Sequence, residues 1–294
     1  MFEFDHTIST ENGRQIQILE SGQPDGVPVV VHSGTPSSRL LFRHWVEDAL
    51  SRGIRLIGYD RPGYGGSEAA PGRIVADAAD DIAAIARALG ISRLGVWGAS
   101  GGGPHALACA ALLPDLVAAA AALASPAAYP SEGLDWFAGM GEDNILEFHK
   151  ALESREALQS FVESSAPSML DGEPESLVHA LQSLLSPVDA AVVSGDFAAF
   201  LLKSIREAIG ERGDGWVDDD LAFVRPWGFQ LSQIRTPVLL WHGRHDRFVP
   251  FSHGEWLARH IPKVDARLSE DDGHLTLILR RIPDVHSWLL EQMK

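Results

Sequence analysis

The chain of 294 residues has little cysteine, no long hydrophobic run and fewer basic than acidic residues. Cys109 is the only cysteine, so an internal disulfide bond is impossible and a reducing compartment fits. No segment approaches the roughly 18 consecutive apolar residues that cross a bilayer. The first residues also lack the basic start and apolar stretch of a signal peptide. We therefore expect a cytoplasmic protein with no membrane partner.

The shortage of basic residues bears on partners. There are 24 Lys and Arg against 40 Asp and Glu, which gives a formal net charge of −16. Such a chain repels phosphate backbones, so nucleic acid is not expected as a partner. Hydrophobic residues make up 45% of the chain, which is enough for a buried core.

The pattern of apolar residues predicts an α/β fold. Asn12-Gly13 between two extended runs, 2–8 and 14–20, is a hairpin signal. Apolar residues at spacings of three and four then predict a helix over 74–89. Strand-like runs with no wet face alternate with such helical patterns, at 27–32, 56–60, 94–97, 117–124 and 238–242. This alternation is typical of a mostly parallel, doubly wound sheet.

The alternation stops between residues 126 and 232, where the pattern is helical and strand-poor, and resumes at 233. We predict a core formed by 1–125 and 233–294, with 126–232 as a helical insertion. The insertion holds 19 acidic and 6 basic residues, which is most of the net negative charge. A solvated acidic face is the default explanation.

The most informative stretch surrounds Ser100. An apolar strand runs into residues 98–102, Gly-Ala-Ser-Gly-Gly, and then into an Ala-rich helical segment. A serine on a tight strand-to-helix turn points its hydroxyl outward, and small residues two positions away let strand and helix approach closely. The Gly101 N–H, near a helix N-terminus, is then free to stabilise an oxyanion. A flexible glycine turn is the bland alternative.

A serine nucleophile needs a base and a group that orients the base. His274 lies in a polar loop before the C-terminal helix, and Asp246 lies in a loop after the run 238–242. The chain order Ser, Asp, His favours these two residues. Asp220, in the acidic run near the end of the insertion, is a weaker candidate for the acid, and His105 is expected to point away.

A second oxyanion donor is expected from the loop after 27–32. Residues 33–36 read Ser-Gly-Thr-Pro, and small residues there can bring a backbone N–H beside the nucleophile. Thr35 is the preferred donor, with Gly34 as the alternative. An ordinary strand-to-helix turn would account for the same sequence.

Along essentially its whole length the sequence resembles the α/β-hydrolase superfamily. The matching parts are the Ser100 turn, the 32–36 loop, residues 60–67 (Asp-Arg-Pro-Gly-Tyr-Gly-Gly-Ser), the Asp246 loop and His274. The resemblance implies that 60–67 is a structural turn beside the nucleophile and that 126–232 caps the active site. One departure concerns the oxyanion loop: many relatives carry His-Gly-x-Pro, whereas Ser33 stands at the histidine position here, after His32.

These features predict a serine hydrolase without metal or cofactor, acting on an ester, lactone, thioester or amide of a small, largely apolar molecule, as a monomer or homodimer. Aromatic and apolar insertion residues could line its pocket: Trp136, Phe137, Met140 and Trp227. Three other functions stay open. They are an aminopeptidase of the prolyl-aminopeptidase type, whose cap carboxylate would recognise an amine; a carbon–carbon bond hydrolase or lyase; and a non-catalytic ligand-binding protein.

Overall fold

The computed structural model describes residues 2–170, 172–210 and 212–294. Its centre is one eight-stranded sheet in the order β1-β2-β4-β3-β5-β6-β7-β8. β1 and β2 run antiparallel to their neighbours. The other strands, which are β4, β3, β5, β6, β7 and β8 in sheet order, are parallel to one another. The strands are β1 Phe2–Ser9, β2 Gln15–Gly22, β3 Val27–His32, β4 Ile54–Tyr59, β5 Leu94–Ala99, β6 Val117–Leu123, β7 Val238–Gly243 and β8 Val264–Ser269. This confirms the predicted α/β fold with a mostly parallel sheet.

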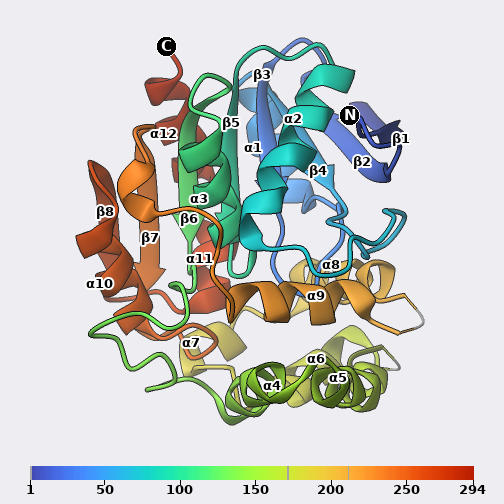
Figure 1. The fold of residues 1–294 in the computed structure, drawn as a ribbon, viewed down its shortest axis with the longest axis vertical. Helices are drawn as coiled ribbons and strands as arrows, with labels where there is room; N and C mark the ends of the chain where they lie inside the picture. Colours follow the sequence, from blue (N-terminus) through green and yellow to red (C-terminus); the bar gives the residue numbers. More distant parts are fainter. Residues whose placement is uncertain (1, 171, 211) are drawn as a thin grey trace.

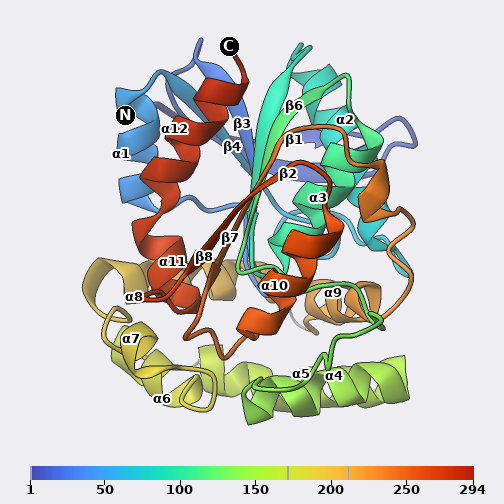
Figure 2. The same ribbon diagram turned by 90° about the vertical axis from the view of Figure 1, so that its left-hand side faces the viewer.

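Helices cover both faces of the sheet (Figure 2). α1, α11 and α12 lie on one face, and α2, α3 and α10 lie on the other. Their bounds are α1 Arg43–Ser51, α2 Ala78–Ala88, α3 Gly102–Leu112, α10 Phe251–His260, α11 His274–Arg280 and α12 Ile282–Gln292. Alternate residues of β3 show the consequence, because Val29 and Val31 belong to one buried cluster and Val30 to the other. Parallel strands covered on both faces have no wet face, as their apolar sequence indicated.

The segment between β6 and β7 is helical, as expected. It holds α4 Glu142–Glu153, α5 Arg155–Leu170, α6 Leu177–Ala180, α7 Pro187–Ala190, α8 Gly195–Ala208 and α9 Asp214–Phe223. These helices lie together beyond the carboxyl ends of the parallel strands (Figure 1). Residues 171 and 211 of the predicted insertion lie outside the described residues, and its division from the core at 126 and 232 stays a prediction.

Small differences from the sequence pattern occur at element ends. The predicted helix 74–89 is a short 3-10 turn, η1 Val75–Asp77, followed by α2. Two further 3-10 turns occur, η2 Pro174–Ser176 and η3 Leu231–Gln233. His274, expected in a loop, is the first residue of α11 and is buried. Among the described residues, none of the helices combines the length and hydrophobicity that a membrane span requires.

Candidate active site

Ser100 occupies a strained turn between β5 and α3. Its φ is 54°, a left-handed conformation that is unusual for a residue with a side chain. The turn closes only because its flanking residues are glycines: a Cβ on Gly98 would lie 2.1 Å from the Gly102 carbonyl oxygen, and one on Gly102 would lie 1.9 Å from the His32 carbonyl oxygen. The strand and helix therefore approach as the glycine spacing predicted, in the geometry of a nucleophile elbow.

His274 and Asp246 lie in direct contact at the ends of β7 and β8. His274 Nδ1 is 2.8 Å from Asp246 Oδ2, and both side chains are buried. Asp246 Oδ1 accepts the backbone N–H groups of Phe248 and Val249, at 2.9 and 2.8 Å, which fixes the carboxylate. With Nδ1–H donated to Asp246, the other ring nitrogen of the neutral His274 ring is free to accept a proton.

Electrostatics favour the charged form of His274. Burial alone would lower its pKa, but the charge and hydrogen bond of Asp246 outweigh burial and raise the pKa above its ordinary value. Asp246 has a second imidazole neighbour, since His242 Nε2 lies 3.5 Å from its Oδ2. Burial lowers the pKa of His242, whose Nε2 also lies 2.9 Å from the Val249 carbonyl oxygen. His242 is thus neutral, and a proton on Nε2 serves that carbonyl.

The backbone at the start of α11 is held by a carboxylate from the inserted segment. Asp189, fully buried in α7, accepts the backbone N–H groups of His274 and Thr276, each at 2.9 Å. The first N–H groups of a helix have no partner within the helix, so an aspartate there acts as a cap. Asp189 therefore fixes the position of His274 from outside the sheet core.

The predicted oxyanion loop packs directly on Ser100. A Cβ on Gly34 would lie 3.5 Å from the Ser100 Cβ, and one on Gly101 would lie 2.3 Å from Thr35 Oγ1. Arg61 donates hydrogen bonds to the carbonyl oxygens of Ser33 and Gly34, the second at 2.7 Å. In a trans peptide the N–H points opposite to the C=O. Because the Gly34 carbonyl faces Arg61, the Thr35 N–H of that peptide points to the other side.

A buried ionic cluster braces this loop. Asp219 in α9 lies 2.6 Å from both Arg61 Nη2 and Arg73 Nη1, and it accepts the Thr35 and Tyr64 hydroxyl groups at 2.7 and 2.9 Å. Burial alone would raise the pKa of Asp219, but the two guanidinium groups lower it well below its usual range. In this loop, where Ser33 replaces the histidine of many relatives, Arg61 and Asp219 hold the backbone and the Thr35 side chain.

Ser100, His274 and the loop of residues 33–36 line one cavity of about 170 Å³. Its wall is largely apolar and aromatic, and includes Trp136 and Met140 of the predicted substrate residues. Phe137 and Trp227 lie outside this lining. The Phe137 ring packs against the ring of His149, and Trp227 is buried against Phe229. None of the described residues that line the cavity is an arginine or a lysine.

This geometry can be compared with known proteins. Residues 27–280 match the family model described as the alpha/beta hydrolase fold. The chain belongs to the α/β-hydrolase family.

Relatives of this α/β hydrolase include two named enzymes. A pimeloyl-[acyl-carrier protein] methyl ester esterase of Nitrosomonas europaea is 26% identical, covering 92% of each chain. A 2-hydroxy-6-oxononadienedioate/2-hydroxy-6-oxononatrienedioate hydrolase of Burkholderia vietnamiensis is also 26% identical, covering 90% of this chain and 86% of the relative. The fold matches a thermophilic esterase of Thermogutta terrifontis with a TM-score of 0.69 and 22% identity, over 99% of this chain and 100% of the esterase.

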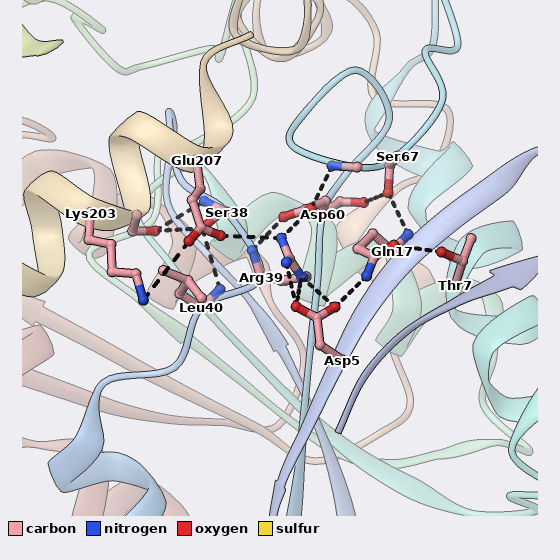
Figure 3. Close-up of polar contacts among 12 residues, drawn as sticks. Asp5, Thr7, Gln17, Ser38, Arg39, Leu40, Asp60, Ser67, Lys203 and Glu207 are labelled. Atoms are coloured by element: carbon pink, nitrogen blue, oxygen red, sulfur yellow. Dashed lines mark hydrogen bonds and ion pairs between the residues drawn. The ribbon is translucent and has the colours of Figure 1, made fainter. Parts of the chain in front are cut away.

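The turn after β4 in this α/β hydrolase makes structural contacts (Figure 3). Asp60 accepts hydrogen bonds from the Arg39 backbone N–H at 2.6 Å and from Arg39 Nη1 at 3.0 Å. The Ser67 hydroxyl donates to the Asp60 carbonyl oxygen at 2.6 Å and accepts the Gln17 N–H at 2.9 Å. Arg39 also reaches Glu207 of α8 at 3.4 Å. These bonds tie the N-terminal hairpin and α8 to this turn, which fits the expected structural role.

The remaining candidates take other positions. Asp220 lies in the cavity lining, whereas Asp246 is the acid in contact with His274. His105 is buried with Nε2 3.4 Å from Asp219 Oδ1, so it belongs to the loop brace. Cys109 is buried among core residues, and burial raises the pKa of its thiol. Among the residues described, no group of three or more His, Cys, Asp or Glu is arranged to hold a metal ion.

Sequence reasoning did not assign Arg61, Asp189, Asp219 or Glu147 to the site. Arg61 belongs to the 60–67 turn, which is one of the motifs that carry the family resemblance. A signal for it was available, because an arginine next to a buried aspartate in such a turn needs a partner of its own. The three carboxylates carry no local motif, and only the fold brings them to the cavity.

Proposed function

We propose that this protein is a serine ester hydrolase in which Ser100 attacks the acyl carbon, His274 is the general base and Asp246 orients it. The observation that carries the proposal is the 2.8 Å contact of Asp246 with His274, which lines the same cavity as the strained Ser100. Strain of this kind is kept where it serves a function, and a relay beside a serine favours acyl transfer.

The proposed reaction has two halves. The Ser100 hydroxyl gives its proton to His274 Nε2 as Oγ bonds to the acyl carbon, and the carbonyl electron pair moves onto oxygen. The backbone N–H groups of Gly101 and Thr35 would stabilise that oxyanion. His274 then protonates the departing alcohol as the ester bond breaks. A water molecule, deprotonated by His274, releases the acid and restores the serine.

The cavity supports a small acyl group without an anionic charge. Its volume is about 170 Å³, its wall is mostly apolar, and none of its described lining residues is an arginine or a lysine. A cavity of this kind favours short acyl chains and disfavours carboxylate-bearing substrates, because a buried carboxylate needs a cationic partner. The carbon–carbon hydrolase relative acts on a dioate by its name, so its chemistry is the second candidate. The lack of arginine and lysine in the described lining favours ester hydrolysis.

The test is labelling with a fluorophosphonate, followed by hydrolysis of nitrophenyl esters from acetate to dodecanoate. We expect the label on Ser100, no label on Ser100→Ala, and the highest kcat/KM for the short acyl chains. Ser183→Ala is the matched control, because Ser183 contacts Asp143 and lies outside the cavity lining. Labelling that persists in Ser100→Ala would refute the proposal. Cleavage of a ring-opened dienoate diketone without ester cleavage would favour the second candidate.

The setting proposed for this reaction is the cytoplasm, where the protein would act on a small molecule. This proposal rests on the single, buried cysteine, which fits a reducing compartment.

A further inference from the structure

Two buried carboxyl groups face each other in the cavity that holds Ser100. Glu147 comes from α4 and Asp220 from α9, and their exposed fractions are 9% and 1%. The two side chains interact, and Glu147 also accepts a hydrogen bond from the Trp216 indole N–H. Both residues line the cavity together with Ser100 and His274. The mechanism proposed above uses neither of them.

The neighbouring aspartates of α9 have cationic partners. Asp218 lies 2.5 Å from Arg155, and Asp219 lies between Arg61 and Arg73. Within the described part of the chain, neither Asp220 nor Glu147 has an ion pair with a basic residue. Asp220 Oδ2 is also buried without a hydrogen-bond partner there. The pair therefore lacks a cationic partner in the described part of the chain and has capacity to accept further hydrogen bonds.

Burial and the proximity of the two groups favour protonation of this pair. Burial, and then the charge of Glu147, raises the pKa of Asp220 well above its usual range, and burial raises that of Glu147. The pair therefore keeps a proton to higher pH than two ordinary carboxyl groups would. The oxygens of the pair that carry no proton are hydrogen-bond acceptors, and both residues line the cavity. A buried acceptor without a partner costs stability, and such groups gather at functional sites.

We propose that Glu147 and Asp220 form a polar subsite that binds a hydrogen-bond-donating group, a hydroxyl or an amine, on the substrate of Ser100. The subsite rests on the ester hydrolysis proposed above and narrows its substrate class. Donors are favoured over acceptors because the pair has four oxygens and few protons, and one oxygen already accepts from Trp216. Anionic groups are disfavoured because the described lining offers no arginine or lysine side chain.

Rigid, matched esters test this subsite. The series consists of nitrophenyl benzoates that carry an ethyl, hydroxymethyl or aminomethyl group, each at the para and the meta position. The three groups have nearly the same shape and differ in hydrogen bonding and charge. We expect a hydroxymethyl or aminomethyl ester to exceed its ethyl counterpart by about tenfold or more in kcat/KM, the size of one hydrogen bond to a charged group. Equal rates for all three at both positions would overturn the subsite.

Variants connect the preference to the two carboxyl groups. Asp220→Leu should remove the preference, so that the hydroxymethyl and aminomethyl esters no longer exceed the ethyl ester in kcat/KM. Asp220→Asn should keep part of a hydroxymethyl preference and lose an aminomethyl preference, which separates the two donors. Glu147→Gln is the second variant if Asp220→Leu fails to fold. The control is Asp214→Asn, on the same helix but with a half-exposed side chain outside the cavity. A preference that survives in both Asp220→Leu and Glu147→Gln refutes the subsite.

The experiments distinguish an error in the proposed subsite from an error in the proposed ester hydrolysis. Fluorophosphonate labelling of Ser100 and turnover of the ethyl ester report the hydrolysis alone. If both are present without donor preference, only the subsite is wrong. If the serine is not labelled and no ester is cleaved, the hydrolysis is wrong and the subsite falls with it.

Discussion

The replacement Asp219→Asn separates the buried brace from the reacting groups. Asp219 is fully buried and lies 2.6 Å from each of two guanidinium groups, Arg61 and Arg73. Asparagine keeps the shape but removes the charge, which leaves both guanidinium groups buried with their main counter-charge gone. Breaking a buried pair costs about 3–5 kcal/mol. Because the asparagine oxygen still accepts hydrogen bonds, we expect the free energy of unfolding to fall by the lower figure, about 3 kcal/mol.

Activity should fall as well. Asp219 holds Thr35 through its hydroxyl at 2.7 Å, and Arg61 holds the Gly34 carbonyl oxygen. Loss of one oxyanion donor costs about 10²–10³ in kcat. A loosened donor costs less than a missing one, so we expect kcat on a short-chain ester to fall by about 10- to 100-fold. Fluorophosphonate titration would count the intact sites, so that a folding defect is not mistaken for slow turnover.

The assay pairs urea denaturation, followed by tryptophan fluorescence, with these kinetics. Asp214→Asn is the control, since its carboxylate is half-exposed and 3.8 Å from Arg212, and it should change stability by less than about 0.5 kcal/mol. The difference between wild type and Asp219→Asn should also shrink in acid. A lowered pKa gives stability that is present above the unfolded-state pKa and lost as pH falls through the folded-state pKa. An Asp219→Asn protein as stable and as active as wild type would refute the brace.

Three further predictions concern the other carboxylates and the base. The kcat/KM for an ester should rise with pH as His274 loses its proton, with a midpoint above the ordinary histidine value because its pKa is raised; a midpoint below it would contradict the Asp246 contact. Asp189→Asn should lower the free energy of unfolding by about 0.5–2 kcal/mol by weakening the cap of α11, and should lower kcat through His274; unchanged kcat would show that the cap does not position the base. Asp220→Asn should raise the unfolding midpoint at pH 8 and have less effect at pH 5. The reason is that stability tied to a raised pKa is lost as pH rises toward the folded-state value. Calorimetry at both pH values checks this, and a lower midpoint at pH 8 would contradict it.

Local sequence patterns predicted most of the fold and three side chains of the candidate site. The strands at 27–32 and 238–242 were readable because parallel strands buried on both faces are uniformly apolar. Ser100 was readable because its turn requires small residues at fixed positions, which leaves a motif. Asp246 and His274 follow strand-like runs in the expected chain order. Each of these signals lies within about ten residues of the group it identifies.

The loop braces and the carboxyl pair leave no such local signal. Arg61 and Asp219 are separated by 158 residues, and Asp189 and His274 by 85. Their side chains meet only after the inserted helices dock on the strand ends, and aspartates at helix starts or in acidic runs are equally compatible with a solvated face. The choice of Trp227 as a lining residue failed to match the cavity for a related reason. An aromatic residue in the insertion can equally pack against its own segment, as Trp227 does against Phe229.

The acidity of the inserted segment is therefore more than a solvated surface. Asp189 fixes the helix start that carries His274, and Asp219 braces the loop that carries Thr35. Asp220 faces the cavity itself. All three side chains are at most 1% exposed. Because burying an unpaired carboxylate costs free energy, they depend on partners in the sheet core or in the cavity. The inserted helices thus contribute to the geometry of the candidate site from two sides. A related insertion grafted onto this core would need aspartates at both positions before Ser100 could be supported in the same way.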